Sequence, residues 1–539
     1  MMKLVTVAEM KAIEQEANAR GLTYAMMMEN AGKGVAEVVQ LAYSQLEEKI
    51  VVGLVGPGNN GGDTLVALRR LSGMGWKAIA YLVRPRESGD PLVQSLVEAG
   101  GEVLQGDQDR GWQQLDDCLS RSSVLLDGVL GTGVQLPLKA DLAKLLGHVA
   151  AFLPLPRVVA VDCPSGVASD TGQAAPECIP AGLTVCMEAV KTGLLAFPAF
   201  SMVGRLEVVG LGLPADLESA KTTQREVVGK AWVREKLPAR PLDSHKGTFG
   251  TVLIAAGSIN YTGAAFLSAK AAYRIGAGLV RLAVAGPLHA ALAGHLPEAT
   301  WLILPHEQGV ISENAAEVLA NNLEKADVLL LGPGWGLEET TAAFLQRLLT
   351  RKAVHSRGAI GFVNPARGEE SPAANEALPA LVIDADGLKL LAQIPDWPEY
   401  IQTPAVLTPH PGEMSALTGL KIAEIQANRL EIAIKYALEW RQVVILKGAV
   451  SVVAAPDGRI AVIPIATSAL AHAGTGDVLA GMVAGLRAQG VTAFEAAAAA
   501  AWMHARAGVL AADWLGNPAS VLASDVLDSI AEVLQEVTE

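Results

Sequence analysis

The sequence predicts an α/β protein with two domains, each built on a largely parallel sheet. The chain has 539 residues, and a single hydrophobic core usually stops growing at roughly 250 to 300 residues. Short apolar runs alternate with helical patterns along most of its length, which favours strands covered by helices on both faces. Hydrophobic residues make up 51% of the chain but aromatic residues only 4%. Small residues therefore supply much of the apolar content, as in closely packed α/β layers.

In the first half, two helical segments precede a series of apolar runs. The helices are predicted over residues 7–19 and 24–46. The runs that follow are short and apolar throughout, which is typical of strands buried on both faces; they cover residues 50–55, 78–83, 124–126 and 158–161. We predict a three-layer α/β domain over residues 1–220.

The pattern dissolves into polar, charged and proline-containing sequence over residues 213–240, where we place the domain junction. A second α/β series follows, with helices at 263–274 and 422–437, two long C-terminal helices, and strands at 252–255, 327–331, 381–383, 405–407 and 443–446. It predicts a second domain over residues 228–539. The Gly/Pro-rich stretch 352–379 is long for an internal connection and is interpreted as a surface insertion.

Bulk properties exclude several classes of protein. The longest apolar stretch, residues 496–512, contains His504 and Arg506, so we expect a buried helix and no membrane association. Residues 1–9 lack a secretory apolar segment, which favours a cytoplasmic protein. The net charge of −14 opposes nucleic-acid binding. Four cysteines without CxxC spacing indicate buried thiols rather than a disulfide framework or a zinc site. The expected assembly is a homo-oligomer.

A glycine-rich turn follows the first predicted strand. The segment from Gly56 to Asp63 reads GPGNNGGD and leads into a helix predicted to begin near Asp63. Exposed helix N–H groups and close backbone approach at such a turn suit an anionic ligand. The alternative is structural, since Gly61 and Gly62 could simply permit a positive φ.

Two further strand ends place a carboxylate beside a glycine turn. Asp127 is followed by GVLGTGVQLP, and Asp162 is followed by CPSG. Either aspartate alone could cap a helix or brace a turn. Because three such termini converge on one edge of the predicted sheet, their recurrence favours a site.

These segments, followed by Lys191-Thr-Gly-Leu-Leu, resemble the NAD(P)H-hydrate epimerase family, also called the YjeF N-terminal domain, over about residues 1–215. The resemblance implies a Rossmann-like domain with Asp162 at the reacting end of the substrate, where it would serve as the acid/base for inversion at C6 of the hydrated nicotinamide. It also implies a potassium ion held by Asn60, Asp127 and Ser165. The remaining substrate contacts that it implies are Asn59, Asn60, Gly61, Gly62, Asp63, Gly131, Thr132, Gly133, Val134, Gln135, Leu136 and Pro137.

The strongest local signal of the second half is Gly474-Thr475-Gly476-Asp477 at the start of a predicted helix. Backbone amides there can stabilise a phosphate, and the carboxylate can take a proton from a hydroxyl group. The structural alternative is an acidic residue favoured by the helix dipole alone.

This segment resembles the anion hole of ribokinase-like proteins, in which the aspartate is the catalytic base. With SHKGTFG, GSINYTGAA, GPGWG, DADGL, TPHPGE and LKG in order, the second half resembles the ADP/ATP-dependent NAD(P)H-hydrate dehydratase family, the YjeF C-terminal domain. The resemblance implies a ribokinase-like domain in which Gly263, His410 and Asp477 contact the hydrate. ADP or ATP is implied as cosubstrate, with Mg²⁺ oriented by Asp384 and Glu413. Its implied nucleotide contacts are Lys447, Gly448, Ala449, Gly474, Thr475 and Gly476.

Together the two resemblances imply a bifunctional repair enzyme that interconverts the R and S hydrates of NADH and NADPH and dehydrates the S form. One alternative is a ribokinase-superfamily small-molecule kinase fused to a ligand-binding Rossmann-like domain, since a kinase would share the anion hole. Another is a first half that only binds a ligand or assists assembly. Recovery of reduced nicotinamide would distinguish the repair enzyme from the kinase, which would leave a stable phosphorylated product. If the first half only binds a ligand, substitution of Asp162 should leave interconversion of the two hydrate epimers unchanged.

Overall fold

The computed structural model describes residues 2–350 and 378–539 and divides into two compact units. The N-terminal unit is Met2–Val227 and the C-terminal unit is Val228–Glu539. The predicted surface insertion at 352–379 lies outside the described residues except for its last two positions.

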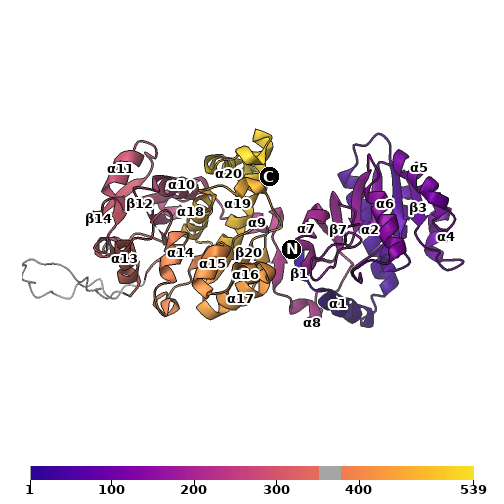
Figure 1. The fold of residues 1–539 in the computed structure, drawn as a ribbon, viewed down its shortest axis with the longest axis horizontal. Helices are drawn as coiled ribbons and strands as arrows, with labels where there is room; N and C mark the ends of the chain where they lie inside the picture. The colour runs from indigo at the N-terminus through magenta and orange to yellow at the C-terminus, as the bar shows by residue number, and fades with distance from the viewer. Residues whose placement is uncertain (1, 351–377) are drawn as a thin grey trace, which may run out of the picture. The chain divides into compact units, whose positions relative to one another are not determined.

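The N-terminal unit is centred on a seven-stranded parallel sheet (Figure 1). Its middle strands are buried on both faces, as their continuous apolar runs predict. Because the strands are parallel, all their carboxyl ends lie at one edge of the sheet. In spatial order the strands are β4 (Glu102–Gln105), β3 (Lys77–Leu82), β2 (Ile50–Val55), β5 (Val124–Gly128), β6 (Arg157–Val161), β7 (Leu183–Met187) and β9 (Arg205–Val209).

Separate hydrophobic cores on the two faces of this sheet make the unit three-layered. Val51 and Leu126 belong to one core, and Val52 and Leu125 to the other, because successive strand residues point to opposite faces. The first core includes residues of α1 to α4, and the second includes residues of α5 and α6. The helices are α1 (Val7–Ala19), α2 (Tyr24–Ala42), α3 (Asn59–Gly73), α4 (Pro91–Glu98), α5 (Gln113–Arg121), α6 (Ala140–Ala150), α7 (Phe200–Val203) and α8 (Glu218–Lys221).

Two helix boundaries in this unit differ from the sequence prediction. Helix α2 ends at Ala42, four residues early, because Tyr43 leaves helical geometry at φ −125°. Helix α3 begins at Asn59 rather than near Asp63, so the glycine pair lies inside its first turns.

The sequence did not predict strands β4, β7 and β9 of this sheet. It also did not predict three short strands of the same unit, which are β1 (Met2–Val5), β8 (Ala189–Lys191) and β10 (Arg225–Val227). Strand β1 pairs in parallel with β8, with Val5 opposite Lys191, and antiparallel with β10. The start of the chain is therefore paired with the strand that ends at Lys191.

The C-terminal unit is built on a second sheet, parallel from β13 to β19 and antiparallel beyond it. The α/β fold class predicted for the chain is confirmed. In spatial order this sheet contains β13 (Thr300–Leu304), β12 (Leu279–Ala285), β11 (Thr251–Ala255), β16 (Val328–Leu331), β17 (Ala380–Ile383), β18 (Val406–Leu407), β19 (Val443–Leu446), β20 (Val452–Ala454) and β21 (Ile460–Val462). A separate hairpin joins β14 (His306–Glu307) and β15 (Val310–Ile311).

The predicted single helix over 422–437 is wrong. Two helices occupy the region, and Asn428 between them has non-helical φ and ψ of −132° and 45°. Three helices rather than two close the chain. The helices of the unit are α9 (Lys230–Lys236), α10 (Thr262–Arg274), α11 (Gly286–Leu292), α12 (Ala315–Ala320), α13 (Glu339–Thr350), α14 (Asp386–Leu391), α15 (Pro411–Thr418), α16 (Ile422–Ala427), α17 (Arg429–Trp440), α18 (Thr475–Ala488), α19 (Ala493–Leu515) and α20 (Ala523–Thr538).

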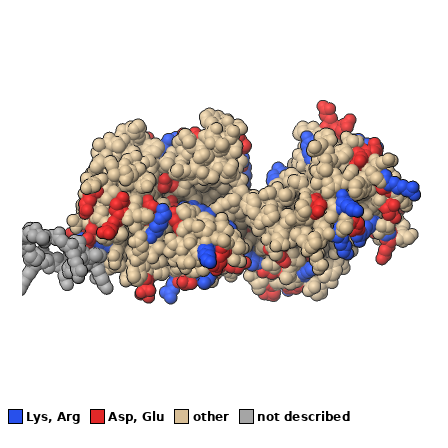
Figure 2. Space-filling view, in the orientation of Figure 1, with Lys and Arg blue, Asp and Glu red and all other residues tan. Residues whose placement is uncertain are grey.

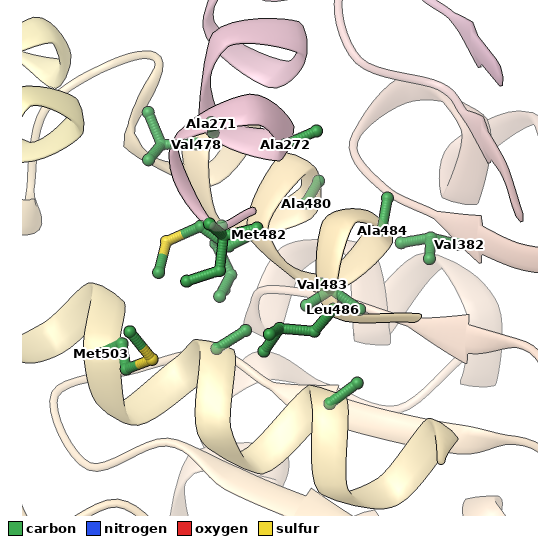
Figure 3. Packing of buried hydrophobic residues seen from close by; sticks show 14 of the residues in the cluster. Ala271, Ala272, Val382, Val478, Ala480, Met482, Val483, Ala484, Leu486 and Met503 are labelled. Carbon is green, nitrogen blue, oxygen red and sulfur yellow. The ribbon is translucent and has the colours of Figure 1, made fainter. Parts of the chain in front are cut away.

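Helix α18 lies in the centre of the C-terminal core and is packed through small residues (Figure 3). A Cβ atom at Gly481 would lie 2.2 Å from the backbone oxygen of Ser268 on α10. A Cβ atom at Gly485 would lie 2.8 Å from the backbone oxygen of Ala272. The two helices therefore approach to backbone contact, which only glycine permits at these positions.

The apolar stretch 496–512 lies in α19, which is the predicted buried helix. Among the described residues, none of the helices combines the length and apolar character needed to cross a membrane. All four cysteines are free and buried, as predicted. On the face shown in Figure 2, acidic and basic side chains are interspersed without a broad basic surface.

Candidate functional site

Asp162 lies directly after β6, at the carboxyl edge of the N-terminal sheet. Its φ of 64° is in the left-handed region, and its backbone N–H donates to Val185 O at 2.9 Å. The Met187 N–H donates to Oδ1 of Asp162 at 2.9 Å. The Lys191 ammonium contacts the same carboxylate oxygen. A strained backbone therefore presents a carboxylate whose orientation is fixed by two donors.

Lys191 is one of the most deeply buried side chains of the unit, with 1% exposure. Its ammonium also donates to Met187 O at 3.1 Å. Burial acts to lower the pKa of Lys191, but the negative charge and hydrogen bond of Asp162 outweigh it, so that the pKa is raised. Lys191 therefore stays charged and pairs with Asp162.

Two further carboxyl groups lie within electrostatic reach of this pair. Burial, reinforced by the charges of Asp162 and Glu14, raises the pKa of Asp63 well above its ordinary value. Burial also raises the pKa of Glu14, against the opposing charge of Lys191. The sequence indicated Asp63 and Asp162 but not Glu14, nor the burial of Lys191.

Asp127 is fully buried at the end of β5 and is bound to Ser165. Ser165 donates to Asp127 through its N–H at 2.7 Å and through Oγ at 2.5 Å. Burial raises the pKa of Asp127 although these hydrogen bonds oppose the shift. The Leu130 N–H donates to Ser165 Oγ at 2.9 Å, and Asn60 Nδ2 donates to Leu130 O at 2.8 Å. One network thus joins the three residues for which a potassium ion was expected.

The two glycine-containing loops lie side by side. A Cβ atom at Gly131 would lie 3.3 Å from that of Asn60. A Cβ atom at Gly61 would lie 2.0 Å from Gly56 O, so that position requires glycine. The structure therefore brings together the start of the segment 59–63 and the start of the segment 131–137. Asn59, Gly133, Gln135 and Pro137 are exposed, and Thr132, Val134 and Leu136 are half-buried.

In the C-terminal unit, Asp477 lies in the first turn of α18, which begins after Gly474 in the left-handed region at φ 90°. Burial raises the pKa of Asp477 to about 7, and the negative charge of Asp384 adds to the shift. Lys447 acts in the opposite direction. A carboxyl group with this pKa can accept a proton near neutral pH and release it again.

Lys447 is held by two buried carboxylates. Its Nζ lies 2.7 Å from Asp384 Oδ1 and 3.6 Å from Glu413 Oε2. Thr408 Oγ1 also donates to Asp384 Oδ1 at 2.5 Å, whereas Asp384 Oδ2 is buried without a hydrogen-bond partner. A Cβ atom at Gly476 would lie 3.6 Å from Lys447 Nζ, so the ammonium lies beside the start of α18.

His410 is the N-cap residue of α15, and its imidazole lies beside Glu413, one of the two carboxylates that hold Lys447. Its Nδ1 accepts from the Gly412 N–H at 2.9 Å, and its N–H donates to Glu413 Oε2 at 2.8 Å. The imidazole remains 49% exposed, so one side is accessible to a ligand. Gly263 lies in the first turn of α10, where a Cβ atom would meet no other atom within 4 Å.

Two side chains near the proposed nucleotide contacts were not singled out from the sequence. Arg429 donates to Leu446 O at 2.8 Å and to Val450 O at 3.2 Å, which supports the turn containing the exposed Gly448 and Ala449. Burial lowers the pKa of Arg429 to about 10. His504 on α19 is buried, and burial lowers its pKa to about 4 although the backbone of Thr475 opposes the shift. A neutral histidine thus lies behind the start of α18.

Comparisons with known proteins match both halves of the chain. A model of the NAD(P)H-hydrate dehydratase family matches residues 252–360 and 366–532, and a model described as the YjeF-related protein N-terminus matches residues 24–193. The bifunctional NAD(P)H-hydrate repair enzyme of Moorella thermoacetica is 36% identical over 517 residues, which cover 94% of this chain and 92% of the relative. The enzyme of the same name from Escherichia coli is 31% identical over 500 residues, covering 92% of this chain and 86% of the relative.

A solved structure also matches part of the chain. The ADP/ATP-dependent NAD(P)H-hydrate dehydratase from Bacillus subtilis, co-crystallised with ATP/Mg²⁺, is 28% identical with a TM-score of 0.46. The match covers 58% of this chain and 98% of that chain.

Proposed function

The chain belongs to the family of bifunctional NAD(P)H-hydrate repair enzymes, and we propose that its two units perform two successive steps of that repair. The N-terminal unit interconverts the R and S hydrates of NADH and NADPH. The C-terminal unit dehydrates the S form with ADP or ATP, and AMP or ADP and phosphate are released.

For the epimerase, the supporting observation is the buried ion pair at the carboxyl edge of the sheet. Asp162 is held by Lys191 and Met187 in one orientation, as an acid/base group at a reacting carbon must be. The amides at the start of α3 and the adjacent 131–137 loop would bind the phosphates and ribose of the substrate. Asn59, Gly61, Gly62 and Asp63 belong to the first of these segments.

For the dehydratase, the supporting observation is a carboxyl group with a pKa of about 7 at a helix N-terminus beside a buried ammonium. Asp477 would take the proton of the C6 hydroxyl as its oxygen attacks the terminal phosphorus of the nucleotide. The amides of Gly474 to Gly476 and the Lys447 ammonium would stabilise the transferring charge. The ring nitrogen lone pair would then expel phosphate from C6 and form a C6=N bond. Loss of a proton from C5 to the released phosphate or to water would complete the C5=C6 double bond and regenerate the reduced nicotinamide.

The C-terminal residues also fit the substrate and metal roles that the family implies. His410 presents an accessible imidazole, and Gly263 leaves room for close approach. Gly448 and Ala449 lie on an exposed turn suited to a nucleotide. Asp384 has a buried oxygen without a partner, and with Glu413 it would orient hydrated Mg²⁺, which would neutralise phosphate charge.

The Asn60 network fits a potassium ion. Asn60 Oδ1 is buried without a hydrogen-bond partner, and the neighbouring Asp127 and Ser165 supply further oxygen donors. Oxygen donors with a single carboxylate suit a monovalent cation. Such an ion would neutralise the clustered oxygens and fix the two loops.

The test supplies mixed hydrate epimers with ADP or ATP and follows the absorbance of reduced nicotinamide. The unmodified chain should convert the whole mixture. Asp162→Asn should convert only the S fraction, apart from slow spontaneous epimerisation. Asp477→Asn should stop dehydration but still interconvert the epimers. Asp513→Asn, an equal charge change at an exposed position on α19, serves as the matched control. A stable phosphorylated product without nicotinamide recovery would instead establish the kinase alternative.

A further inference from the structure

The turn proposed to contact the nucleotide connects two antiparallel strands. Strands β19 and β20 pair with each other, and residues 447–451 join them. Gly448 and Ala449 are exposed in this turn. Ser451 fixes it from within, because its Oγ accepts from the Gly448 N–H at 3.3 Å and donates to Gly448 O at 3.2 Å.

A second side chain fixes the same turn from outside. Arg429 is the first residue of α17. Its Nη2 donates to Leu446 O at 2.8 Å and to Val450 O at 3.2 Å, so that one nitrogen bridges the two sides of the turn. A Cβ atom at Gly448 would lie 2.6 Å from the same Nη2 atom, which places the guanidinium directly against the Gly448 backbone. The conformation of the turn therefore depends on a residue of a separate helix.

The positive charge of Arg429 has no counter-charge within the described part of the chain. Its remaining hydrogen bond runs from Nη1 to the side-chain oxygen of Gln426 at 2.7 Å, so the three acceptors are all neutral. Burial lowers the pKa of Arg429 to about 10, which leaves the guanidinium charged at neutral pH. Cations removed from water normally pair with an anion, and phosphates are favoured partners of arginine. A nucleotide bound at the turn would bring that negative charge.

We propose that Arg429 is a positioning residue of the dehydratase, which holds the turn 447–451 in the conformation that binds ADP or ATP and whose charge is balanced by the phosphates of the bound nucleotide. The inference rests on the proposed dehydratase function and extends its nucleotide site by one residue. Arg429 acts through the backbone of the turn rather than on a reacting atom.

Loss of Arg429 should therefore affect nucleotide binding and leave the chemical step intact. The Lys447 ammonium is held independently of Arg429, by Asp384 and Glu413. The kcat at saturating nucleotide and the KM for the hydrate should thus stay within about twofold of their original values. The KM for the nucleotide should rise about tenfold, as expected when hydrogen bonds from a charged group are lost.

The test is steady-state dehydration of pure S hydrate by the full chain carrying Arg429→Met. The nucleotide is varied at saturating hydrate, and the hydrate at saturating nucleotide. Arg429→Lys keeps the charge but not the planar fork of donors, so its nucleotide KM should lie between those of Arg429→Met and the unmodified chain. Arg441→Met removes an equal charge from an exposed residue at the other end of α17 and should leave all three constants unchanged.

Binding is also measured without turnover. ADP alone should raise the melting temperature of the C-terminal unit, because a ligand that binds the folded state stabilises it. At the same ADP concentration the rise should be smaller with Arg429→Met, and the melting curve without ADP reports whether this variant is folded.

Two results would overturn the proposal. One is a folded Arg429→Met protein whose nucleotide KM and ADP-induced melting shift equal those of the unmodified chain. The other is a rise of both KM values by the same factor, which would indicate general damage to the unit. If Arg429→Met does not fold, Arg429→Lys decides by the same two measurements. An unmodified chain that restores no reduced nicotinamide with ADP or ATP would instead refute the proposed function itself.

Discussion

Replacing Lys191 with methionine would leave a carboxylate without its counter-ion inside the N-terminal unit. The Lys191 side chain is 1% exposed and that of Asp162 is 13% exposed. Removing one partner of a buried pair costs about 3–5 kcal/mol. Because each kcal/mol shifts the melting temperature of a domain this size by about 2–4 °C, the melting transition of the unit should fall by roughly 6–20 °C.

The loss should be present at both acidic and mildly alkaline pH. Because the pKa of Lys191 is raised above its ordinary value, its ammonium is charged at pH 5 and at pH 8, so Lys191→Met should remove the ion pair and lower the melting temperature at both. The double variant Lys191→Met with Asp162→Asn carries no unpaired charge and should recover most of the lost stability without recovering epimerase activity. Differential scanning calorimetry of the three proteins at both pH values measures this. If the single variant melted with the unmodified chain at pH 8, the argument from the buried pair would be refuted.

Four further predictions concern other parts of the two sites. The dehydratase kcat/KM should fall as the pH drops below about 7, where Asp477 becomes protonated; Asp477→Asn should lower it by about 10²–10⁴-fold, and an unchanged rate in steady-state assays would exclude Asp477 as the base. Since the folded pKa of Asp477 is raised, its ionised form costs stability as the pH rises above its ordinary value, so Asp477→Asn should melt higher than the unmodified chain at pH 8 and lose that advantage near pH 4. Gly61→Ala places a Cβ atom 2.0 Å from Gly56 O and should cost about 1–3 kcal/mol together with substrate binding, as calorimetry and epimerase KM would show. Potassium should raise the melting temperature of the N-terminal unit more than tetramethylammonium does, and Asn60→Ala should abolish that difference.

Local sequence patterns predicted most of the strands that carry the sites. The runs at Ile50–Val55 and Val443–Leu446 were predicted with their observed bounds, since an apolar run bounded by turn residues has few other solutions in a parallel sheet. The helix beginning before Asp477 was likewise predicted from a glycine turn and an early acidic residue. The helix break at Asn428 was not predicted, because a single asparagine in an amphipathic pattern is a weak signal for a helix end.

What the sequence could not supply were relations between distant segments. The pairing of β1 with β8 joins residues separated by almost the whole N-terminal unit, and no local pattern encodes it. The burial of Lys191 follows from that pairing and from Asp162, whereas a lysine in isolation is expected to be exposed. Glu14 looked like one of several acidic residues on a surface helix for the same reason. The buried ion pairs could therefore be identified from the folded structure but not from the sequence.

The close approach of α10 and α18 has a consequence for how the dehydratase could move. Gly263 lies in the first turn of α10 and Asp477 in the first turn of α18. The two helices pack closely against each other through the glycines of α18. Neither helix can slide along the other without a steric clash between their backbone atoms. The proposed substrate contact Gly263 and the proposed proton acceptor Asp477 therefore lie on one rigid pair of helices, so we expect any opening or closing during turnover to occur in the loops around that pair.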